Sequence, residues 1–191
     1  MTDPCYITVD IEAAGPNPHD YSMLSLGAAT LDEPRKSFYV EIQPINDNET
    51  EGAAAIHGLS LKKLAKEGVP PKEALERLED WLKEVSGENK DIVFVAFNAP
   101  FDWMFVSDYF HRFLGRNPFG HRALDIKALF MGLHGIAWAA TTHKAISEHY
   151  GLPNSLPHRA EEDALQEAEI LKFLLKELKD VHPEWLEESL K

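Results

Sequence analysis

The segment from Asp91 to Phe97 constrains the fold more than any other part of the sequence. It is apolar at every position after Asp91, as expected for a strand that is buried on both faces of a sheet. Asn98 is a favourable helix N-cap, Pro100 suits a first helical turn, and apolar residues then recur at helical spacing as far as Phe113. A buried strand that leads directly into a helix is typical of an α/β sheet covered by helices.

The remaining elements agree with this class. Three strands are expected first, and strands then alternate with helices, so we predict an α/β fold with a mixed five-stranded sheet and flanking helices. A polar connector over residues 46–71 should contain one short helical piece near 61–67. The expected strands are 6–12, 22–31, 37–43, 92–97 and 122–126, and the expected helices are 71–85, 101–114, 126–133, 141–149 and 160–178.

Length and composition are those of one globular domain. The chain has 191 residues, of which 44% are hydrophobic and 27% charged, enough for a single core. We expect one domain over residues 1–180, followed by an acidic C-terminal tail over 181–191 with one helical turn around Trp185.

Cys5 is the only cysteine, which excludes an intrachain disulfide and any multi-cysteine zinc site. No leader pattern and no apolar stretch near about 18 residues is present, so we expect a cytoplasmic protein without a membrane span.

Two acidic residues end the first expected strand. Asp10 and Glu12 alternate with apolar residues, so their side chains should share one face, with Cα atoms roughly 6 to 7 Å apart. Carboxylates in that relation can share hard divalent cations. The run from Ala13 to Pro18 should end the strand and leave a surface that a ligand can approach closely. Taken alone, this pattern is more often a strand end with two solvated acids.

Two further fragments carry acidic residues near helix starts. Asp102 falls in the first turn of the helix that follows the buried strand, where ligand sites of α/β sheets gather. His158 and Asp163 would lie about 140° apart on one regular helix, so they can converge only if His158 precedes the helix. Pro157 favours that arrangement, with the helix starting near Arg159. Each fragment alone is also explained by a carboxylate that complements a helix dipole, or by a surface histidine.

Taken together, in this chain order and with these spacings, the fragments resemble the DEDDh (DnaQ-like) family of 3′-5′ exonucleases. The resemblance extends from about Tyr6 to Leu178. The segments Met23–Ala29 and Ile56–Leu59 are also similar to family segments, and His57 corresponds to a histidine that lies near the substrate terminus. The family's two threonines after the first motif are Ala13 and Ala14 here, and a glutamate common in its second strand is Ser25. These departures affect contacts to the terminal nucleotide, so the sequence does not identify the substrate.

The resemblance implies a ribonuclease H-like fold and a metal-dependent 3′-5′ exonuclease. Asp10, Glu12, Asp102 and Asp163 become ligands of two divalent ions, Mg²⁺ or Mn²⁺, since such ions prefer oxygen donors. His158 becomes the general base that takes a proton from the attacking water, because free imidazole titrates near pH 6.5. Hydrolysis from a free 3′-hydroxyl would release nucleoside 5′-monophosphates. The candidates for substrate contacts are Ala13, Ala14, Pro16, Met23, His57 and Phe101, although Met23 and Phe101 are equally well explained by core packing.

Several functions remain compatible with these residues. The expected substrate is the 3′ end of single-stranded DNA or RNA, and a ribonuclease T-like or oligoribonuclease-like enzyme would share every catalytic residue. A proofreading subunit would work beside a polymerase, and a second copy of the chain is another candidate partner. A non-catalytic nucleic-acid-binding module is less favoured, because every acidic ligand is retained.

The net charge opposes extensive nucleic-acid binding. It is −13 at pH 7, whereas Lys and Arg contacts to phosphates normally supply most non-specific affinity. We therefore expect a small footprint, in which bound cations attract the scissile phosphate and a few basic side chains hold the next nucleotides. The candidates for that role are Arg112, Arg116, Arg122, Lys144 and Arg159.

Overall fold

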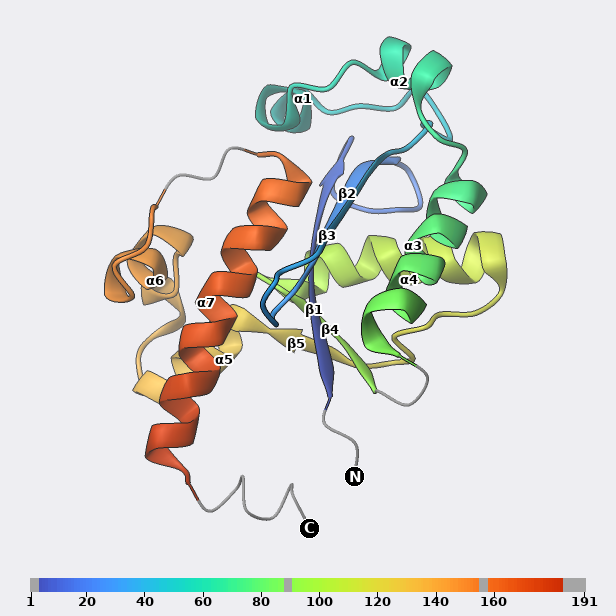
Figure 1. The fold of residues 1–191 in the computed structure, drawn as a ribbon. Helices are drawn as coiled ribbons and strands as arrows, with labels where there is room; N and C mark the ends of the chain where they lie inside the picture. The colour runs from blue at the N-terminus through green and yellow to red at the C-terminus, as the bar shows by residue number, and fades with distance from the viewer. Residues whose placement is uncertain (1–3, 88–90, 155–157, 184–191) are drawn as a thin grey trace.

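The protein has a five-stranded sheet with helices on both faces (Figure 1). The structure is a computed structural model that describes residues 4–87, 91–154 and 158–183. The strand order is β3-β2-β1-β4-β5. β1, β2 and β3 pair antiparallel, whereas β4 runs parallel to β1 and β5 runs parallel to β4. The strands are β1 (Cys5–Ala13), β2 (Met23–Thr30), β3 (Ser37–Glu41), β4 (Ile92–Ala96) and β5 (Ala123–Asp125).

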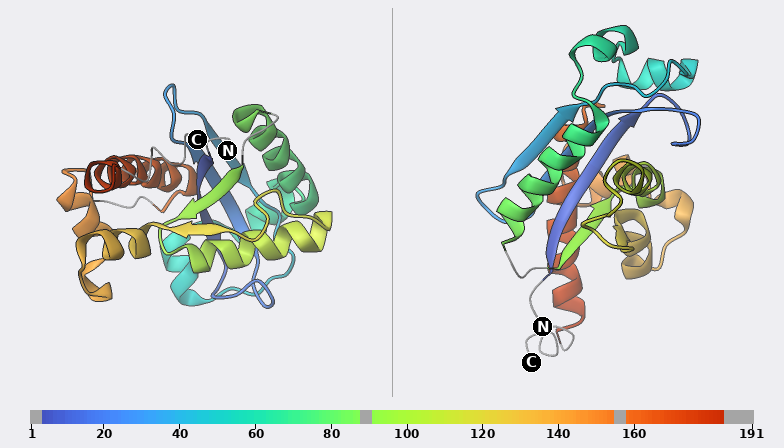
Figure 2. Two further views of the ribbon diagram at one scale, coloured as in Figure 1. Left: turned by 90° about the horizontal axis from the view of Figure 1, so that it is seen from below. Right: turned by 90° about the vertical axis from the view of Figure 1, so that its right-hand side faces the viewer.

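Two groups of helices cover the sheet. α3 and α4 pack on one face, and α7 packs on the other with α5 and α6 beside it (Figure 2). Two short helices, α1 and α2, lie beyond the end of β1. The helices are α1 (Glu51–His57), α2 (Leu61–Glu67), α3 (Pro71–Ser86), α4 (Ala99–Leu114), α5 (Ile126–His134), α6 (His143–His149) and α7 (Ala160–Val181), with a 3₁₀ turn at Trp138–Ala140.

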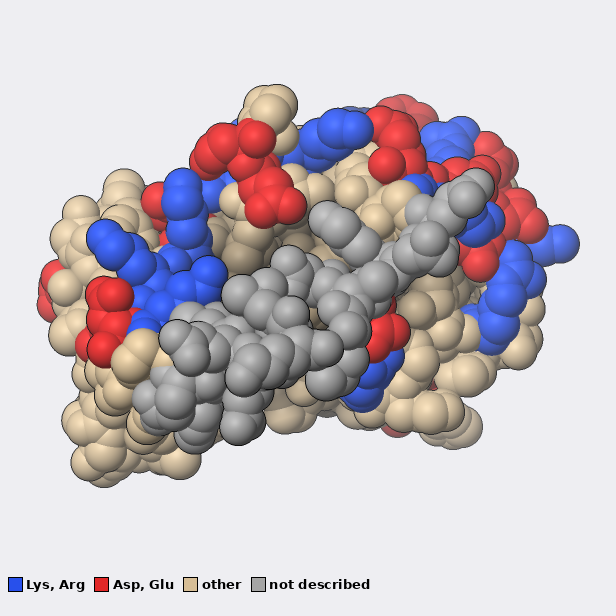
Figure 3. Space-filling model, turned by 60° about the horizontal axis from the view of Figure 1, so that its bottom comes forward, with Lys and Arg blue, Asp and Glu red and all other residues tan. Residues whose placement is uncertain are grey.

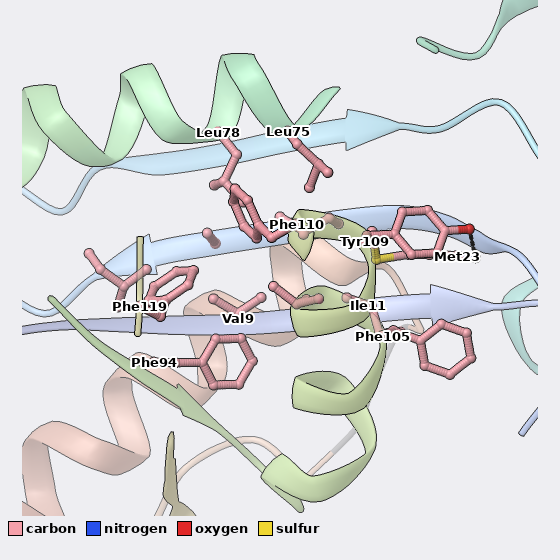
Figure 4. Packing of buried hydrophobic residues seen from close by; sticks show 14 of the residues in the cluster. Val9, Ile11, Met23, Leu75, Leu78, Phe94, Phe105, Tyr109, Phe110 and Phe119 are labelled. Atoms are coloured by element: carbon pink, nitrogen blue, oxygen red, sulfur yellow. Dashed lines mark hydrogen bonds between the residues drawn. The ribbon is translucent and has the colours of Figure 1, made fainter. Parts of the chain in front are cut away.

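Alternation along β1 decides which face receives the acidic residues. Val9 and Ile11 point into the core beneath α3 and α4, where they meet Phe94, Phe105 and other apolar side chains (Figure 4). Side chains of the intervening positions point to the opposite face. The Thr8 hydroxyl on that face donates a hydrogen bond to the Ala164 carbonyl oxygen of α7 at 2.8 Å. Asp10 and Glu12 therefore lie on the α7 side of the sheet.

The structure confirms the predicted fold class and the element order, with a few corrections. Helix α1 was not expected, since the sequence predicted only a connector there; the Thr50 hydroxyl caps it by accepting a hydrogen bond from Ala53 N. Asn98 does not cap α4 with its side chain; it adopts a left-handed conformation at φ 68°. Helix α7 extends to Val181, and the turn expected around Trp185 lies outside the described residues.

Among the helices of the described ranges, none combines the length and the apolar character that crossing a membrane would require.

Candidate active site

β1 and β2 bring the first two acids against the start of α7. Asp10 is paired in register with Gly27 of β2, and Glu12 is paired with Ser25. A Cβ atom at Gly27 would collide with the backbone of Ala160 and Glu161, in the first turn of α7. Glycine at this position thus allows the helix start to approach the strand that carries Asp10.

Asp102 reaches the same region from the other side of the sheet. It lies in the first turn of α4 and is buried. Its Oδ1 atom accepts a hydrogen bond from Ile11 N at 3.1 Å, so the backbone between Asp10 and Glu12 holds this carboxylate in place. The helix start is anchored by Asp125, whose Oδ2 atom accepts a hydrogen bond from Ala99 N at 2.6 Å.

His158 precedes α7, as its spacing to Asp163 requires. It has a φ of 51°, and the helix begins at Ala160. Asp163 folds back on the chain, and its Oδ2 atom accepts a hydrogen bond from Arg159 N at 3.0 Å. This bond holds Asp163 close to the residue that follows His158. His158 offers a ring nitrogen within 4.8 Å of carboxylate oxygens of Glu12 and Asp163.

These residues converge on one open cleft of about 520 Å³. All five predicted catalytic residues line it, although they come from three separate parts of the chain. The glutamate and aspartates are mostly buried, whereas His158 is exposed. The wall also contains Ile11, Ala13, Gly15, Pro16, Thr50, Ala53, Ile56, Phe97, Asn98, Phe101, His143 and Glu167.

Burial and mutual repulsion raise the pKa values of the carboxyl groups. Burial raises the pKa of Asp102 to about 8, against the hydrogen bond from Ile11 N. Burial and the nearby Asp163 raise the pKa of Glu12 to about 7. Burial also raises the pKa of Asp163 to about 6. The pKa of Asp10 is raised well above its usual range, first by burial and then by the negative charges of Asp102 and Glu167. Such a cluster favours binding of protons or cations.

The sequence analysis missed two residues of the cleft, Glu167 and His143. Glu167 is 3% exposed and its Oε2 atom has no hydrogen-bond partner among the described residues. It lies one helical turn after Asp163, and that spacing among small apolar residues was the available signal. His143 is 8% exposed with an unpartnered Nε2 atom, and burial lowers its pKa. Nothing in the local sequence distinguishes His143 from a surface histidine.

The structure divides the predicted substrate contacts into two groups. Ala13, Pro16 and Phe101 line the cleft, where they contribute an apolar part of its wall. Ala14 and Met23 are fully buried away from it. Buried His57 does not line it either: its Nδ1 atom accepts a hydrogen bond from Leu59 N, and its Nε2 atom lies 3.4 Å from Glu49. The backbone of Ala14 nevertheless supports the cleft, because its carbonyl oxygen accepts a hydrogen bond from Thr50 N before α1.

The basic residues expected to hold nucleotides already have acidic partners. Arg116 pairs with Glu79, and Arg159 pairs with Glu162 at 2.7 Å. The other three candidates form similar pairs, Arg112 with Asp108, Arg122 with Asp91, and Lys144 with Glu148. On the face that Figure 3 presents, basic and acidic side chains are interleaved. The pairing of all five candidates with acidic residues agrees with a small footprint.

The donor set suits hard divalent cations. It consists of carboxylate oxygens, and two of them, Asp163 Oδ1 and Glu167 Oε2, are buried without a hydrogen-bond partner in the described parts of the chain. A cation would supply the missing partner and would relieve the repulsion that raises the carboxyl pKa values. Asp10, Glu12, Asp102 and Asp163 could hold such ions, with Glu167 beside them.

Comparison with known proteins identifies the class. A family model described as an exonuclease (RNase_T) matches residues 7–171. A 3′-5′ DNA exonuclease of Escherichia coli, Cap18, is 39% identical over 169 residues, which cover 88% of this chain and 90% of that protein. The chain therefore belongs to the DEDDh family of 3′-5′ exonucleases, which depend on divalent metal ions.

Solved structures agree on the fold. The nuclease domain of 3′hExo, a DEDDh family member bound to rAMP, has a TM-score of 0.75 at 17% identity, covering 90% of this chain and 92% of that chain. E. coli Exonuclease I in complex with a dT13 oligonucleotide has a TM-score of 0.74 at 15% identity, covering 97% of this chain and 43% of that one. At these identities the likeness concerns the ribonuclease H-like fold alone.

Proposed function

We propose that this exonuclease removes nucleotides one at a time from the free 3′-hydroxyl of single-stranded DNA and releases nucleoside 5′-monophosphates. The observation that carries the proposal is the convergence of four carboxylates and His158 on one open cleft. DNA is favoured over RNA because the 39% identical relative is a DNA exonuclease. A ribonuclease with the same catalytic residues is the second candidate.

The acidic residues would bind two divalent ions, Mg²⁺ or Mn²⁺. Asp10, Glu12, Asp102 and Asp163 would hold them, and Asp10 would be shared. When bound, these ions stabilise the negative charge of the attacking and leaving oxygens in phosphodiester hydrolysis. Backbone hydrogen bonds from Ile11 N and Arg159 N fix the orientation of two of the ligands. The same bonds limit the reorganisation needed when an ion enters.

His158 would act as the general base. It is exposed at the cleft mouth, whereas Glu12 and Asp163 beside it are buried. A neutral imidazole there can take a proton from the attacking water and pass it to solvent. The neighbouring negative charge of Asp163 would stabilise the imidazolium that results.

The rest of the wall would select the strand end. Ile56 is 55% exposed beside Ala13, Pro16 and Phe101, so an apolar surface is available for the terminal base. Neutral His143 has a free Nε2 atom that can donate or accept one hydrogen bond to sugar or phosphate. A 3′-phosphate would add negative charge to an acidic cleft and should block degradation.

The decisive experiment compares matched single-stranded DNA and RNA oligonucleotides in Mg²⁺ or Mn²⁺, with products resolved by length. We expect a ladder shortened from the 3′ end, faster on DNA, and no reaction in EDTA. A 3′-phosphorylated strand and a circular single strand should resist degradation. Rapid cutting of the circle would make the enzyme an endonuclease, and faster cutting of RNA would favour the second candidate. Co-purification with a polymerase would test a proofreading role.

A further inference from the structure

A second group of metal-ligating side chains lies outside the catalytic cleft. His134 ends α5, His149 ends α6, and Glu177 lies on α7. Their donor atoms all lie within 4.8 Å of one another. None of the three lines the cleft, although all three helices lie on the same side of the sheet (Figure 1).

The contacts within this group leave one nitrogen without a partner. The Nε2 atom of His134 is buried and has no hydrogen bond among the described residues. It lies 3.5 Å from Oε2 of Glu177. The ring of His149 packs against that of His134, with centroids 4.7 Å apart and planes at 66°. A buried imidazole nitrogen that has no hydrogen bond, faces a carboxylate and has a second imidazole alongside is compatible with metal coordination.

The surroundings resemble those of a metal site in a further respect. Tyr150 donates a hydrogen bond from its hydroxyl to Oε2 of Glu177 at 2.7 Å. Such a bond fixes the orientation of a ligating carboxylate. Phe130 packs against both imidazoles, and Phe173 stacks on Tyr150, so the group has an apolar border on the protein side. His149 is exposed and leaves the opposite side open to solvent.

We propose that His134, His149 and Glu177 form a transition-metal site that binds Zn²⁺. Two imidazoles and one carboxylate are a ligand set that proteins use for Zn²⁺, with water in the fourth position. The set has two imidazoles, whereas most donor atoms in the catalytic cleft are carboxylate oxygens, which suit Mg²⁺ or Mn²⁺. Each ligand comes from a different helix, so a bound ion would join α5, α6 and α7.

The site would also be linked to the cleft through one short helix. α6 has seven residues; its first, His143, lines the catalytic cleft and its last, His149, is a proposed ligand. A rigid helix of that length spans about 10 Å. An ion that holds the end of α6 would therefore restrain His143 without contacting the substrate.

Zn²⁺ calorimetry on the metal-free full chain tests the site. Asp10→Asn, Asp102→Asn and Asp163→Asn together weaken binding in the catalytic cleft, including at the group of Glu12, His158 and Asp163, and provide the background. In this background we expect one Zn²⁺ to bind, and His149→Gln or Glu177→Gln to weaken its binding at least about 10-fold. Tyr150→Phe, which leaves all three ligands in place, should weaken it by about 10-fold. His121→Gln, at an exposed histidine outside the group, should change nothing.

Two further readouts separate the site from the cleft and from folding defects. Co²⁺ in a four-coordinate nitrogen-oxygen site absorbs visible light far more strongly than octahedral Co²⁺, so the Asp-to-Asn background should keep the strong bands and His149→Gln should lose them. Free Zn²⁺ at about 100 times Kd should raise the melting temperature by about 5 to 10 °C. Circular dichroism in EDTA checks that each variant folds. Equal Zn²⁺ affinity in the background and in folded His149→Gln and Glu177→Gln would overturn the proposal.

Discussion

At the scale of single residues, Asp102 combines burial with a direct backbone hydrogen bond. Asp102→Asn keeps an oxygen that can accept a hydrogen bond from Ile11 N but removes the negative charge of a proposed metal ligand. We expect turnover in Mg²⁺ to fall at least about 100-fold, since even residues that only support a ligand cost about 10- to 100-fold. Oligonucleotide degradation measures this. Turnover close to that of the wild type would refute the site.

The same variant has a distinctive effect on stability in EDTA. Burial raises the pKa of Asp102 to about 8, so the wild-type folded chain must hold a buried charge only above that pH. Asparagine is neutral throughout. The unfolded wild-type chain loses this proton near the ordinary value of 3.8, whereas the folded chain keeps it up to about pH 8. The increase in melting temperature of Asp102→Asn over the wild type should therefore grow between about pH 4 and 8 and stay constant up to pH 9. A melting temperature below that of the wild type throughout this range would indicate a folding defect instead.

Substitution of His158 should have a different effect from substitution of the carboxylates, because a general base affects turnover whereas a ligand also affects metal binding. His158→Ala should lower turnover by about 10²- to 10⁴-fold. It should still bind Mn²⁺, since the four acids proposed to hold the ion are unchanged. Calorimetric Mn²⁺ titration beside single-turnover rates tests both expectations. His121→Ala is the control at an exposed histidine outside the cleft; loss of Mn²⁺ binding in His158→Ala would make His158 a ligand.

Glu167 provides a test of the charge in the cleft. Its carboxyl pKa is raised well above the usual range by burial and by Asp102, and its charge in turn raises the pKa of Asp10. Glu167→Gln should weaken Mn²⁺ binding and raise the melting temperature in EDTA at pH 8, because one buried negative charge is removed. Glu162→Gln, whose carboxylate pairs with Arg159, is the matched control. Unchanged Mn²⁺ affinity in Glu167→Gln would remove Glu167 from the metal centre.

The sequence predicted those residues of the cleft that lie in recognisable local motifs. Asp10, Glu12, Asp102, His158 and Asp163 were recognisable because each sits at a strand end or helix start in a known order. Glu167 and His143 were not, since their burial depends on α7 and α6 packing against the sheet. The placement of His57 likewise depends on Glu49 and Leu59, which local sequence does not reveal.

At the scale of elements, the close packing of α7 on β2 sets the position of Asp163. Gly27→Ala would place a Cβ atom against the backbone of Ala160 and Glu161. We expect this overpacking to lower the free energy of unfolding by about 1 to 3 kcal/mol. Displacement of the helix start should also reduce exonuclease activity. Chemical denaturation and oligonucleotide degradation measure the two effects.

Gly52→Ala is the matched control for that change. Gly52 lies in α1, and a Cβ atom there would meet no atom within 4 Å apart from its chain neighbours and the adjacent backbone of its own helix. Alanine favours a helix over glycine by up to about 1 kcal/mol, so stability should be equal or slightly higher. A Gly27→Ala chain as stable and active as Gly52→Ala would show that the close approach is not required.

Local sequence predicted the helices from α2 to α7 and missed α1. α4 and α7 have first-turn acids and apolar faces over 16 and 22 residues. α1 has only seven residues, and its start is held by a hydrogen bond from Thr50 N to the distant Ala14 carbonyl oxygen. Asn98 was assigned the wrong role for a similar reason, because Asp125 from another strand accepts from Ala99 N instead.

At the scale of the whole molecule, the acidic cleft should make stability depend on pH and on metal ions. The pKa values of Glu12, Asp102 and Asp163 are raised to about 7, 8 and 6. The ordinary values of 4.5 for Glu12 and 3.8 for the two aspartates apply when the chain is unfolded. Between about pH 4 and 8 the metal-free folded chain therefore binds more protons than the unfolded chain. Since stability falls with rising pH wherever the folded state binds more protons, the melting temperature in EDTA should decrease across this window.

Divalent cations should reverse that trend, because they bind the carboxylates only after the protons leave. The increase in melting temperature caused by saturating Mn²⁺ over EDTA should be small at pH 5.5 and should grow up to about pH 8.5. Scanning calorimetry at a series of pH values measures this increase. Asp102→Asn should weaken the dependence on pH of both the melting temperature in EDTA and its increase with Mn²⁺. If the Mn²⁺ effect were the same at pH 5.5 and 8.5, the raised carboxyl pKa values would not belong to the metal-binding groups. The acids that destabilise the metal-free chain would then be separate from those that serve catalysis.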